Sequence, residues 1–437
     1  MYYISSKKDN LYGITDSKDG IEEFYSAKFI YDNFKNIEIK GVVRKETGLS
    51  INVWSLEKEL LKNKIAGFNI DFILEEINSK IIAAKYSGTD IDILVPNFIT
   101  DLGNECFKDY VDLRSIVISN SVTGLGDDCF INCSSLVKVV IPNSVTNIRN
   151  WCFAGCDRLD NIIIPDSVLN LGECCFYNCS DLKTIKLSNN IEYLRGSLFY
   201  GCCDLKEIVI PDSVEKIDNN CFASCTSLKN ITIPDSVKDV GEHCFASCKS
   251  LESINLPNSI DNLDSSCFYD CRELKDIVIP DSVTSLGSFC FYNCLKLKSV
   301  KLPKFLSSLG SRCFFNCKSL ETNIIPDSVD SMEDRCFESC ERLKNVKLSN
   351  QIESLGDRCF AGCSDLEDII IPDSVKSLGN MCFSYCSKLK NIKIPDSIDG
   401  IGDNCFMGCD NLRSIECNKY QAKWLLSDYK DILVIRE

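Results

Sequence analysis

Cysteine gives this 437-residue chain its main capacity for chemistry, since there are 29 cysteines and a single histidine. A thiolate can attack an electrophile, bind a metal ion or form a disulfide. Thirteen cysteines directly precede a phenylalanine and thirteen others lie three residues after one, so that C-F-x-x-C recurs along the chain. The remaining three are Cys174, Cys203 and Cys417. Any chemistry of these thiols must therefore be repeated in the same way along most of the sequence.

Three interpretations of the cysteines compete. They can be small apolar residues of a core, metal ligands, or disulfide partners. The spacing lacks the usual C-x-x-C pair and an accompanying histidine, which argues against zinc. Two cysteines on one helical turn are poorly placed for a disulfide, whereas cysteines of neighbouring repeats are close enough. The odd count argues against such bonds. We favour core thiols, because Leu198 and Tyr110 replace cysteine at two of these positions.

Other chemical groups form weaker patterns. His243 precedes Cys244 and could be imagined as part of a nucleophilic pair, but adjacent side chains point apart and Cys244 belongs to the predicted core. Asp166, Asp212 and Asp235 could line up as a calcium ladder, yet one carboxylate per repeat supplies few of the 6–8 oxygens that calcium takes. We therefore predict that the chain is not an enzyme and that it uses no cofactor or metal ion.

A 23-residue repeat positions these residues. Fourteen phenylalanines recur at this spacing, from Phe107 to Phe406, with no insertion. Six residues after each Phe stands Leu, nine after it Ile or Val (except Asn323), and eleven after it an aliphatic residue (except Cys417). All 11 prolines fall in the column twelve residues after the Phe position, where a strand can leave its ladder. A period of 20–29 residues with one short strand is the signature of a leucine-rich repeat.

The repeat resembles a known family in more detail. Residues 279–300 read I-P-D-S-V-T-S-L-G-S-F-C-F-Y-N-C-L-K-L-K-S-V, which is similar to the BspA-like (Treponema-type) leucine-rich repeat I-P-x-x-V-x-x-I-G-x-x-A-F-x-x-C-x-x-L-x-x-I. The resemblance covers about residues 93–417 and implies a curved solenoid that makes protein–protein contacts; some members are surface adhesins. This chain differs in having Cys where the family mostly has Ala.

The predicted fold class is an α/β solenoid. It is a right-handed coil of 14 leucine-rich repeats with a parallel β-sheet on one face, preceded by a small α+β N-terminal domain. Eight positions of each repeat should point inward. We place the domains at residues 1–83, 84–417 and 418–437, the last a degenerate capping coil with Tyr429 in the next Phe position and a strand over 432–435.

Residues 1–83 lack the repeat, and their patterns predict alternating strands and helices. We predict strands over 2–5, 11–15, 37–43 and 50–54. Apolar spacing predicts helices over 21–34, 55–64 and 68–82. This domain should cover the open edge of the first repeat.

Charge and composition narrow the range of partners. The chain carries 63 acidic and 48 basic residues, a net charge of −15. Such acidity disfavours nucleic acid and anionic lipid as partners, although a basic protein is possible. The longest apolar runs are strand-sized, so we expect no membrane insertion. The first ten residues do not read as a signal peptide. We therefore expect a cytoplasmic protein, and surface exposure stays open.

Stacking of the repeats should align the variable positions into surfaces that bind a protein partner. Ten residues after Phe, aliphatic residues recur on the solvent side of the strand: Val117, Val140, Ile163 and Val209. They form a candidate patch, although β-branched residues also simply favour strands. One residue after Phe stand candidate aromatic anchors: Tyr177, Tyr200, Tyr269, Tyr292 and Phe315. They can equally pack between turns.

A basic column adds a third candidate surface. Arg312, Arg335 and Arg358 lie two residues before Phe in three successive repeats. Like charges about 5 Å apart repel one another unless they are offset. Asp334 and Asp357 could offset them, and so could an acidic partner. The main hypothesis is therefore a non-enzymatic interaction scaffold, and the alternative is a cell-surface or secreted adhesin.

Overall fold

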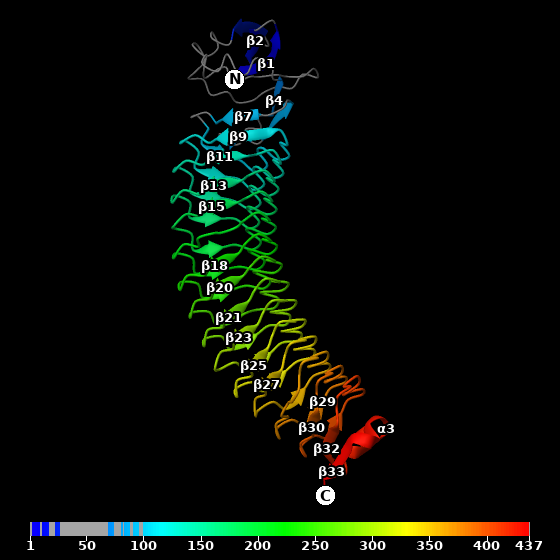
Figure 1. The fold of residues 1–437 in the computed structure, drawn as a ribbon. Coiled ribbons are helices and arrows are strands. Elements are labelled where there is room, and N and C mark those ends of the chain that lie inside the picture. Colours follow the sequence, from blue (N-terminus) through cyan, green and yellow to red (C-terminus); the bar gives the residue numbers. More distant parts are fainter. Residues whose placement is uncertain are drawn as a thin grey trace. The chain divides into compact units, whose positions relative to one another are not determined.

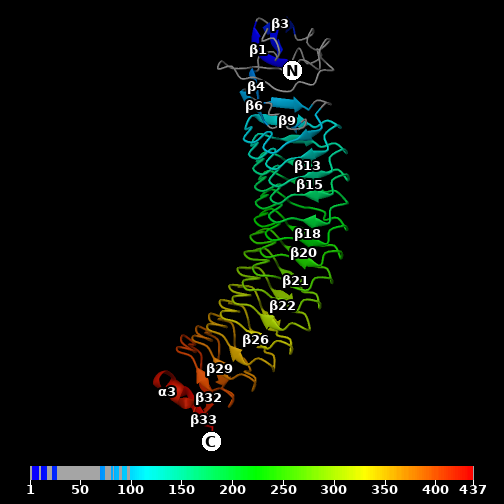
Figure 2. The same ribbon diagram turned by 180° about the vertical axis from the view of Figure 1, so that it is seen from behind.

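The computed structural model of the chain describes residues 2–8, 11–16, 22–26, 69–73, 80–81, 83–87, 91–95 and 99–436. These residues fall into two compact units, residues 1–191 and residues 192–437. In each unit the strands stack in chain order, as Figure 1 and the reverse view in Figure 2 show. The structure confirms the predicted parallel β-solenoid, with little helix in its repeats.

The N-terminal strands form an antiparallel sheet in the order β1-β2-β3 (Tyr2–Lys8, Leu11–Asp16 and Glu22–Ser26). The strands predicted over 2–5 and 11–15 are confirmed. The helix predicted over 21–34 is wrong where the structure describes it, because Glu22–Ser26 pairs with β2 and places Tyr25 opposite Tyr12. Cross-strand pairing of aromatic residues outweighs the local helical spacing there.

The helix predicted over 68–82 is also wrong in its described parts. Strand β4 (Asn69–Ile73) pairs antiparallel with β6 (Ala83–Ser87), and β5 (Lys80–Ile81) pairs parallel with β8 (Asp101–Leu102). The alternation of polar and apolar residues in N-I-D-F supports a strand. The strands predicted over 37–43 and 50–54 and the helix predicted over 55–64 lie outside the described residues. The domain boundaries at 83 and 417 remain predictions.

The main ladder consists of short parallel strands that lie eight to ten residues after Phe in most repeats, although residues 207–209 and 368–370 form no strand. Pairing is in register with a shift of 23 residues, as in Val139 opposite Ile116 and in Val300 opposite Ile277. In the first unit the strands are β7 (Ile91–Leu94), β9 (Leu113–Val117), β11 (Lys138–Val140), β13 (Asn161–Ile163) and β15 (Thr184–Lys186). In the second unit they are β18 (Asn230–Thr232), β20 (Ser253–Asn255), β21 (Asp276–Val278), β23 (Ser299–Lys301), β25 (Thr322–Ile324), β27 (Asn345–Lys347), β30 (Asn391–Lys393) and β32 (Ser414–Asn418).

A second parallel ladder, which the sequence analysis did not predict, uses two-residue strands that end at the apolar residue five positions before the next Phe. Strand β5 adds to the first-unit sheet next to β8. The other first-unit members are β10 (Gly124–Leu125), β12 (Asn147–Ile148) and β14 (Asn170–Leu171). In the second unit they are β16 (Tyr193–Leu194), β17 (Lys216–Ile217), β19 (Asp239–Val240), β22 (Ser285–Leu286), β24 (Ser308–Leu309), β26 (Ser331–Met332), β28 (Ser354–Leu355), β29 (Ser377–Leu378) and β31 (Gly400–Ile401).

Stacked phenylalanines form the centre of each unit. In the first unit the rings of Phe107, Phe130, Phe153 and Phe176 follow one another with centroids 5.2–5.5 Å apart. In the second unit the stack runs from Phe199 to Phe406 with centroids 5.1–5.8 Å apart. Almost all of these rings have no exposed surface. The Phe column is therefore the core that joins each repeat to its neighbour.

The segment around each Phe consists of tight turns, so the helical turn expected for C-F-x-x-C is wrong. In all fourteen repeats the residues two before and two after Phe have positive φ, as at Asp128 and Asn132 around Phe130. A residue in the left-handed region interrupts an α-helix. The position two before Phe holds no glycine and accepts even Trp151 and Arg335, at φ 56° and 60°. Side chains there are held in a conformation that costs L-residues roughly 1–2 kcal/mol.

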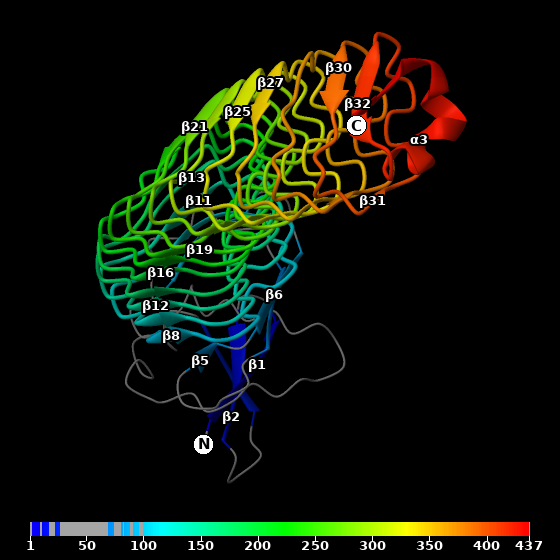
Figure 3. The ribbon, with the colours of Figure 1, turned by 90° about the horizontal axis from the view of Figure 1, so that it is seen from below.

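The C-terminal end of the second unit closes with helix α3 (Ala422–Tyr429), the 3-10 helix η2 (Lys430–Ile432) and strand β33 (Leu433–Arg436), which pairs parallel with β32. Figure 3 shows α3 at this end of the second unit. The strand predicted over 432–435 is thus confirmed, with both of its ends one residue later in the sequence. Tyr429, in the predicted Phe position, makes an edge contact with Phe406 at a centroid distance of 5.9 Å. None of the helices that the structure describes is long and apolar enough to span a bilayer.

Candidate interaction surfaces

The cysteines pack as core residues. Twenty-six of the 29 thiols are buried, and only Cys174, Cys203 and Cys409 are half-exposed. In the column three residues after Phe, the thiol donates a hydrogen bond to the carbonyl oxygen of the preceding repeat's Phe, as from Cys294 Sγ to Phe268 O at 3.2 Å. The same contact recurs at 3.0–3.2 Å in both units. Alanine could not donate this bond, which gives a physical reason for cysteine in this column.

Burial also limits the chemistry of these thiols. It raises the pKa of Cys152 and Cys248 to about 12, and it raises the pKa of most other core thiols as well. A thiol that stays protonated at neutral pH is a poor nucleophile and a poor metal ligand. Within the described residues no group of three His, Cys, Asp or Glu side chains could hold a metal ion. His243 is exposed and the adjacent Cys244 is fully buried, so the two do not form a pair.

Three exposed aliphatic residues lie on neighbouring strands of the first unit. Val117, Val140 and Ile163 end β9, β11 and β13, with side chains 39%, 40% and 63% exposed. Val140 pairs directly with Val117, and Lys186 lies opposite Ile163 on the following strand. We call these three residues the aliphatic patch. Val209, the fourth predicted member, belongs to the second unit and is 82% exposed.

The predicted aromatic column is divided between the units. In the second unit Tyr269, Tyr292 and Phe315 stack face to face with centroids 4.8 and 4.7 Å apart. Phe289 tilts against Tyr292 at 5.8 Å. These rings therefore cover one another's faces and pack between turns, as the alternative explanation expected. In the first unit Tyr177 contacts Trp151 at 5.3 Å, and Tyr200 lies in the second unit.

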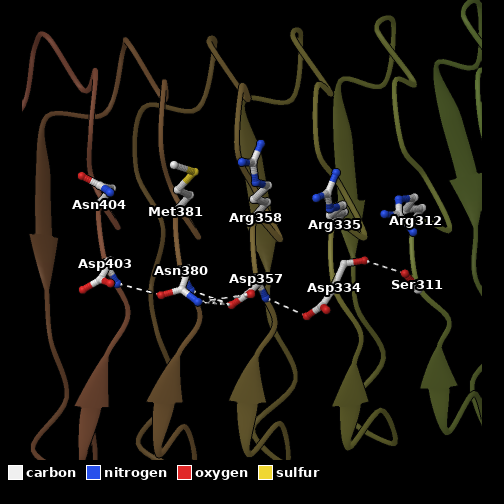
Figure 4. Close-up of a pocket in the computed structure, with 10 residues that line it drawn as sticks. All are labelled: Ser311, Arg312, Asp334, Arg335, Asp357, Arg358, Asn380, Met381, Asp403 and Asn404. Carbon is white, nitrogen blue, oxygen red and sulfur yellow. Dashed lines mark hydrogen bonds between the residues drawn. The ribbon is translucent and has the colours of Figure 1, made fainter.

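The structure brings Arg312, Arg335 and Arg358 together along one groove of the second unit (Figure 4), which has a volume of about 480 Å³. Two parallel rows line it: Arg312, Arg335, Arg358, Met381 and Asn404 in one, and Ser311, Asp334, Asp357, Asn380 and Asp403 in the other. The three arginine side chains project on the same side of the turns (Figure 4). The groove therefore combines donors and acceptors without one dominant charge.

Glu338, rather than Asp334 or Asp357, offsets the arginines. Its two carboxylate oxygens each lie 3.7 Å from Nη1 of Arg335 or Arg358. The guanidinium of Arg312 instead lies over the ring of Phe289, 5.3 Å from its centroid. The expectation that the neighbouring aspartates neutralise the column is thus corrected: one half-buried glutamate lies between two arginines of neighbouring repeats, at ion-pair rather than hydrogen-bond distance.

The aspartates have a structural use. Asp334 Oδ1 accepts the backbone N–H of Asp357 at 2.8 Å, Asp357 Oδ1 accepts that of Asn380 at 2.7 Å, and Asn380 Oδ1 accepts that of Asp403 at 2.9 Å. Figure 4 shows this chain of contacts from repeat to repeat. The first unit has the same arrangement, for example from Asn150 N–H to Asp127. The acceptor side chains therefore link adjacent turns.

We expect Asp357→Ala to destabilise the chain. Loss of the carboxylate leaves the N–H of Asn380 without that acceptor, so the free energy of unfolding of the full chain should fall by about 1 kcal/mol. Asp403→Ala is the matched control, because the Asp403 carboxylate accepts no hydrogen bond from the described residues. The substitution keeps the backbone N–H of residue 403, which donates the last hydrogen bond of the ladder to Asn380. Urea unfolding of both variants measures the difference. Equal effects would show that the side-chain ladder adds nothing.

Sequence reasoning missed several details of these surfaces. The position two residues after Phe is Gly, Asn, Asp or Ser in every repeat except at Tyr385, a composition that signals positive φ. The column two residues before Phe carries no such signal, since it also holds Trp, Phe, Met and Arg. The spacing of residues in the sequence does not show that Glu338 lies close to two arginines, so its role could not be predicted.

Comparison with known proteins agrees with this architecture. A family model described as "BspA type Leucine rich repeat region (6 copies)" matches residues 100–229, 196–321 and 307–423. The chain belongs to the BspA-type leucine-rich repeat family. The predicted resemblance is thereby confirmed, and the matched segments follow one another without a gap through both units.

Solved structures of bacterial leucine-rich repeat proteins are similar to this BspA-type chain. A leucine-rich repeat protein from Bacteroides ovatus shares 26% identity, with a TM-score of 0.66 over 84% of this chain and 98% of that one. A leucine rich cell surface protein from Faecalibacterium prausnitzii shares 24% identity, with a TM-score of 0.43 over 82% of this chain and 95% of that one. A leucine-rich repeat protein from Eubacterium ventriosum shares 20% identity, with a TM-score of 0.48 over 88% of this chain and 95% of that one. No curated protein matches the chain.

Proposed function

We propose that this BspA-type chain is a non-enzymatic scaffold that binds a protein partner through its solenoid surface. The observation that carries the proposal is the aliphatic patch, in which three exposed aliphatic side chains lie on neighbouring strands. A row of exposed apolar side chains on neighbouring strands is a surface that a protein partner can cover. The net charge of −15 argues against nucleic acid as that partner.

The buried thiols support a binding role rather than catalysis. The core cysteines are buried, which raises the pKa of thiols such as Cys152 and Cys248, and the side chain of the single histidine, His243, is exposed rather than packed among them. A core that depends on 26 buried free thiols fits a reducing compartment, so we place the scaffold in the cytoplasm. Family membership favours the alternative, a surface or secreted adhesin, because some BspA-like proteins have that role.

Capture of a partner from native lysate tests the aliphatic patch. The full chain should recover a protein partner, and the double variant Val140→Asp/Ile163→Asp should lose it, because two buried carboxylates would have no counter-charge in an apolar interface. Leu169→Asp is the matched control, because it changes an exposed aliphatic residue of the same unit that lies outside the patch. Unchanged recovery by the double variant would remove the patch from the interface.

Protease treatment of intact native cells separates the two candidate locations. A cytoplasmic scaffold should release no peptides of this chain until the cells are lysed. An adhesin should release peptides from the exposed turns of the repeats at once. The outcome decides the location without depending on the identity of the partner.

A further inference from the structure

A second surface in the second unit has a regular pattern of its own. Ten residues after Phe, aliphatic residues and lysines alternate through six successive repeats: Val278, Lys301, Ile324, Lys347, Ile370 and Lys393. All except Ile370 end strands of the main ladder. We call these residues the lysine–aliphatic row. Register holds them in line, since Val278 pairs with Lys301 and Ile324 pairs with Lys347. The backbone bonds from Glu321 N–H to Lys298 O and from Lys390 N–H to Glu367 O keep the same shift of 23 residues.

All six side chains face solvent. Val278, Ile324 and Ile370 are 61%, 67% and 82% exposed, so most of the surface of each side chain is not used in packing the core. The three lysines are also exposed. Lys347 has one ion-pair partner, Asp327, at the long distance of 4.0 Å. Among the residues that the structure describes, no carboxylate forms an ion pair with either of the other two lysines. The row therefore presents three positive charges inside an acidic protein, each next to an apolar side chain.

A protective role is the competing explanation. Lysines between exposed aliphatic residues can break up an apolar patch and so limit non-specific association. That role requires only a charge, and a glutamate would serve as well as a lysine. A binding role requires the positive sign. The two explanations are therefore separable by reversing the charge.

The spacing of the row indicates the shape of the partner. Neighbouring strands lie about 4.8 Å apart, so the row is about 24 Å long. An α-helix laid along it presents one residue per turn at about 5.4 Å, close to the step of the row. An extended strand presents a residue to one face about every 6.7 Å, which drifts out of step after two repeats. About 16 residues of helix would span the six positions.

We propose that the lysine–aliphatic row binds an amphipathic α-helix of a partner protein, whose facing stripe alternates between apolar and acidic side chains. Apolar residues of the helix pack against Val278, Ile324 and Ile370, and carboxylates pair with the intervening lysines. This inference rests on the proposed scaffold function and assigns to it a contact separate from the aliphatic patch.

The test uses the full chain and a designed fluorescent peptide of about 18 residues, long enough to span the row as a helix. One residue per turn alternates between Leu and Glu, and the other positions are Ala and Gln to favour the helix. Fluorescence anisotropy should show binding that weakens with salt, because the contact is partly ionic. A second peptide with Lys in place of Glu should bind about tenfold more weakly or worse.

Variants of the chain decide between binding and protection. Lys347→Glu should weaken binding of the acidic peptide about tenfold or more, and Ile324→Asp should do the same. Lys298→Glu is the matched control, since this exposed lysine lies beside the row and should leave affinity unchanged. Circular dichroism checks that each variant is folded. Absence of peptide binding, or full binding by Lys347→Glu, would overturn the proposal.

Two further outcomes distinguish binding of a partner helix from dimerisation and from the scaffold function. Sedimentation of the unlabelled chain would overturn it if a dimer forms and Lys347→Glu abolishes that dimer, since the row would then serve a second copy. The aliphatic patch could recover a partner from lysate while the lysine–aliphatic row binds no peptide. That result would contradict this inference and would still support the scaffold function.

Discussion

Raising the pH from about 8 to about 10 should unfold the repeats over a narrow interval. Burial raises the pKa of Cys133, Cys152, Cys248, Cys359 and Cys405 to about 12. An unfolded thiol ionises near pH 8.5. Above that pH the unfolded chain releases protons that the folded chain retains, so the free energy of unfolding falls as the pH rises towards the folded pKa. Below about pH 8 the stabilisation by the neutral thiols is fully present.

The size of this effect follows from the number of thiols. Each one lowers the free energy of unfolding by about 1.4 kcal/mol per pH unit in this range. Cys248, Cys359 and Cys405 together remove about 4 kcal/mol per pH unit from the second unit, and further buried thiols act in the same direction. Domains are commonly stable by about 5–15 kcal/mol. We therefore expect the second unit to unfold between about pH 9 and pH 10.

Circular dichroism and urea unfolding under reducing conditions measure this dependence. The variant Cys359→Ala/Cys405→Ala removes two titrating groups, so the fall of the unfolding free energy with pH should become shallower by about 3 kcal/mol per pH unit. The two alanines also leave the column of Phe rings untouched. A free energy of unfolding that stays constant between about pH 8 and pH 10 would contradict the burial of the thiols.

Replacement of one stacked ring should have the next largest effect. Phe291 is fully buried between Phe268 and Phe314, with centroids 5.3 Å away on each side. Phe291→Ala removes apolar contact with both neighbouring repeats and leaves a cavity that the ladders prevent from closing. The free energy of unfolding should fall by about 3–5 kcal/mol, as measured by urea unfolding. Amide exchange should accelerate most in the repeats around residue 291.

The chain provides a matched control for this substitution. Phe305 is 70% exposed, so Phe305→Ala should change stability by less than about 0.5 kcal/mol. Similar losses for both variants would mean that the Phe column does not form the core. Amide exchange that accelerates uniformly through both units would instead indicate one cooperative array rather than repeats stabilised by their neighbours.

Much of the solenoid could be predicted because the same residue type occupies the same environment in every repeat. A single Phe would be ambiguous, but fourteen at one spacing require stacking in register, and Val139 does pair with Ile116. The N-terminal segment lacks this redundancy. There, Glu22–Ser26 lies in a segment with helical apolar spacing, yet its antiparallel pairing with the preceding strand β2 decides its conformation. Local patterns cannot reveal such pairing.

The candidate surfaces were predictable in position and less so in their contacts. Exposure of Val117, Val140 and Ile163 follows from strand alternation. The alignment of Arg312, Arg335 and Arg358 follows from the repeat, but the bridging by Glu338 depends on side-chain reach across a turn with positive φ. Spacing gives the columns of a solenoid, whereas the partners of long side chains depend on the shape of the turns between them.

Thiol labelling with mass spectrometry, on native protein that has not been reduced, tests most directly whether the repeats stack with their cysteines inside. We expect Cys174, Cys203 and Cys409 to react while the 26 buried thiols stay protected, and all 29 thiols to react after denaturation. Rapid labelling of the buried cysteines in native protein, or a majority that remains blocked after denaturation, would contradict it.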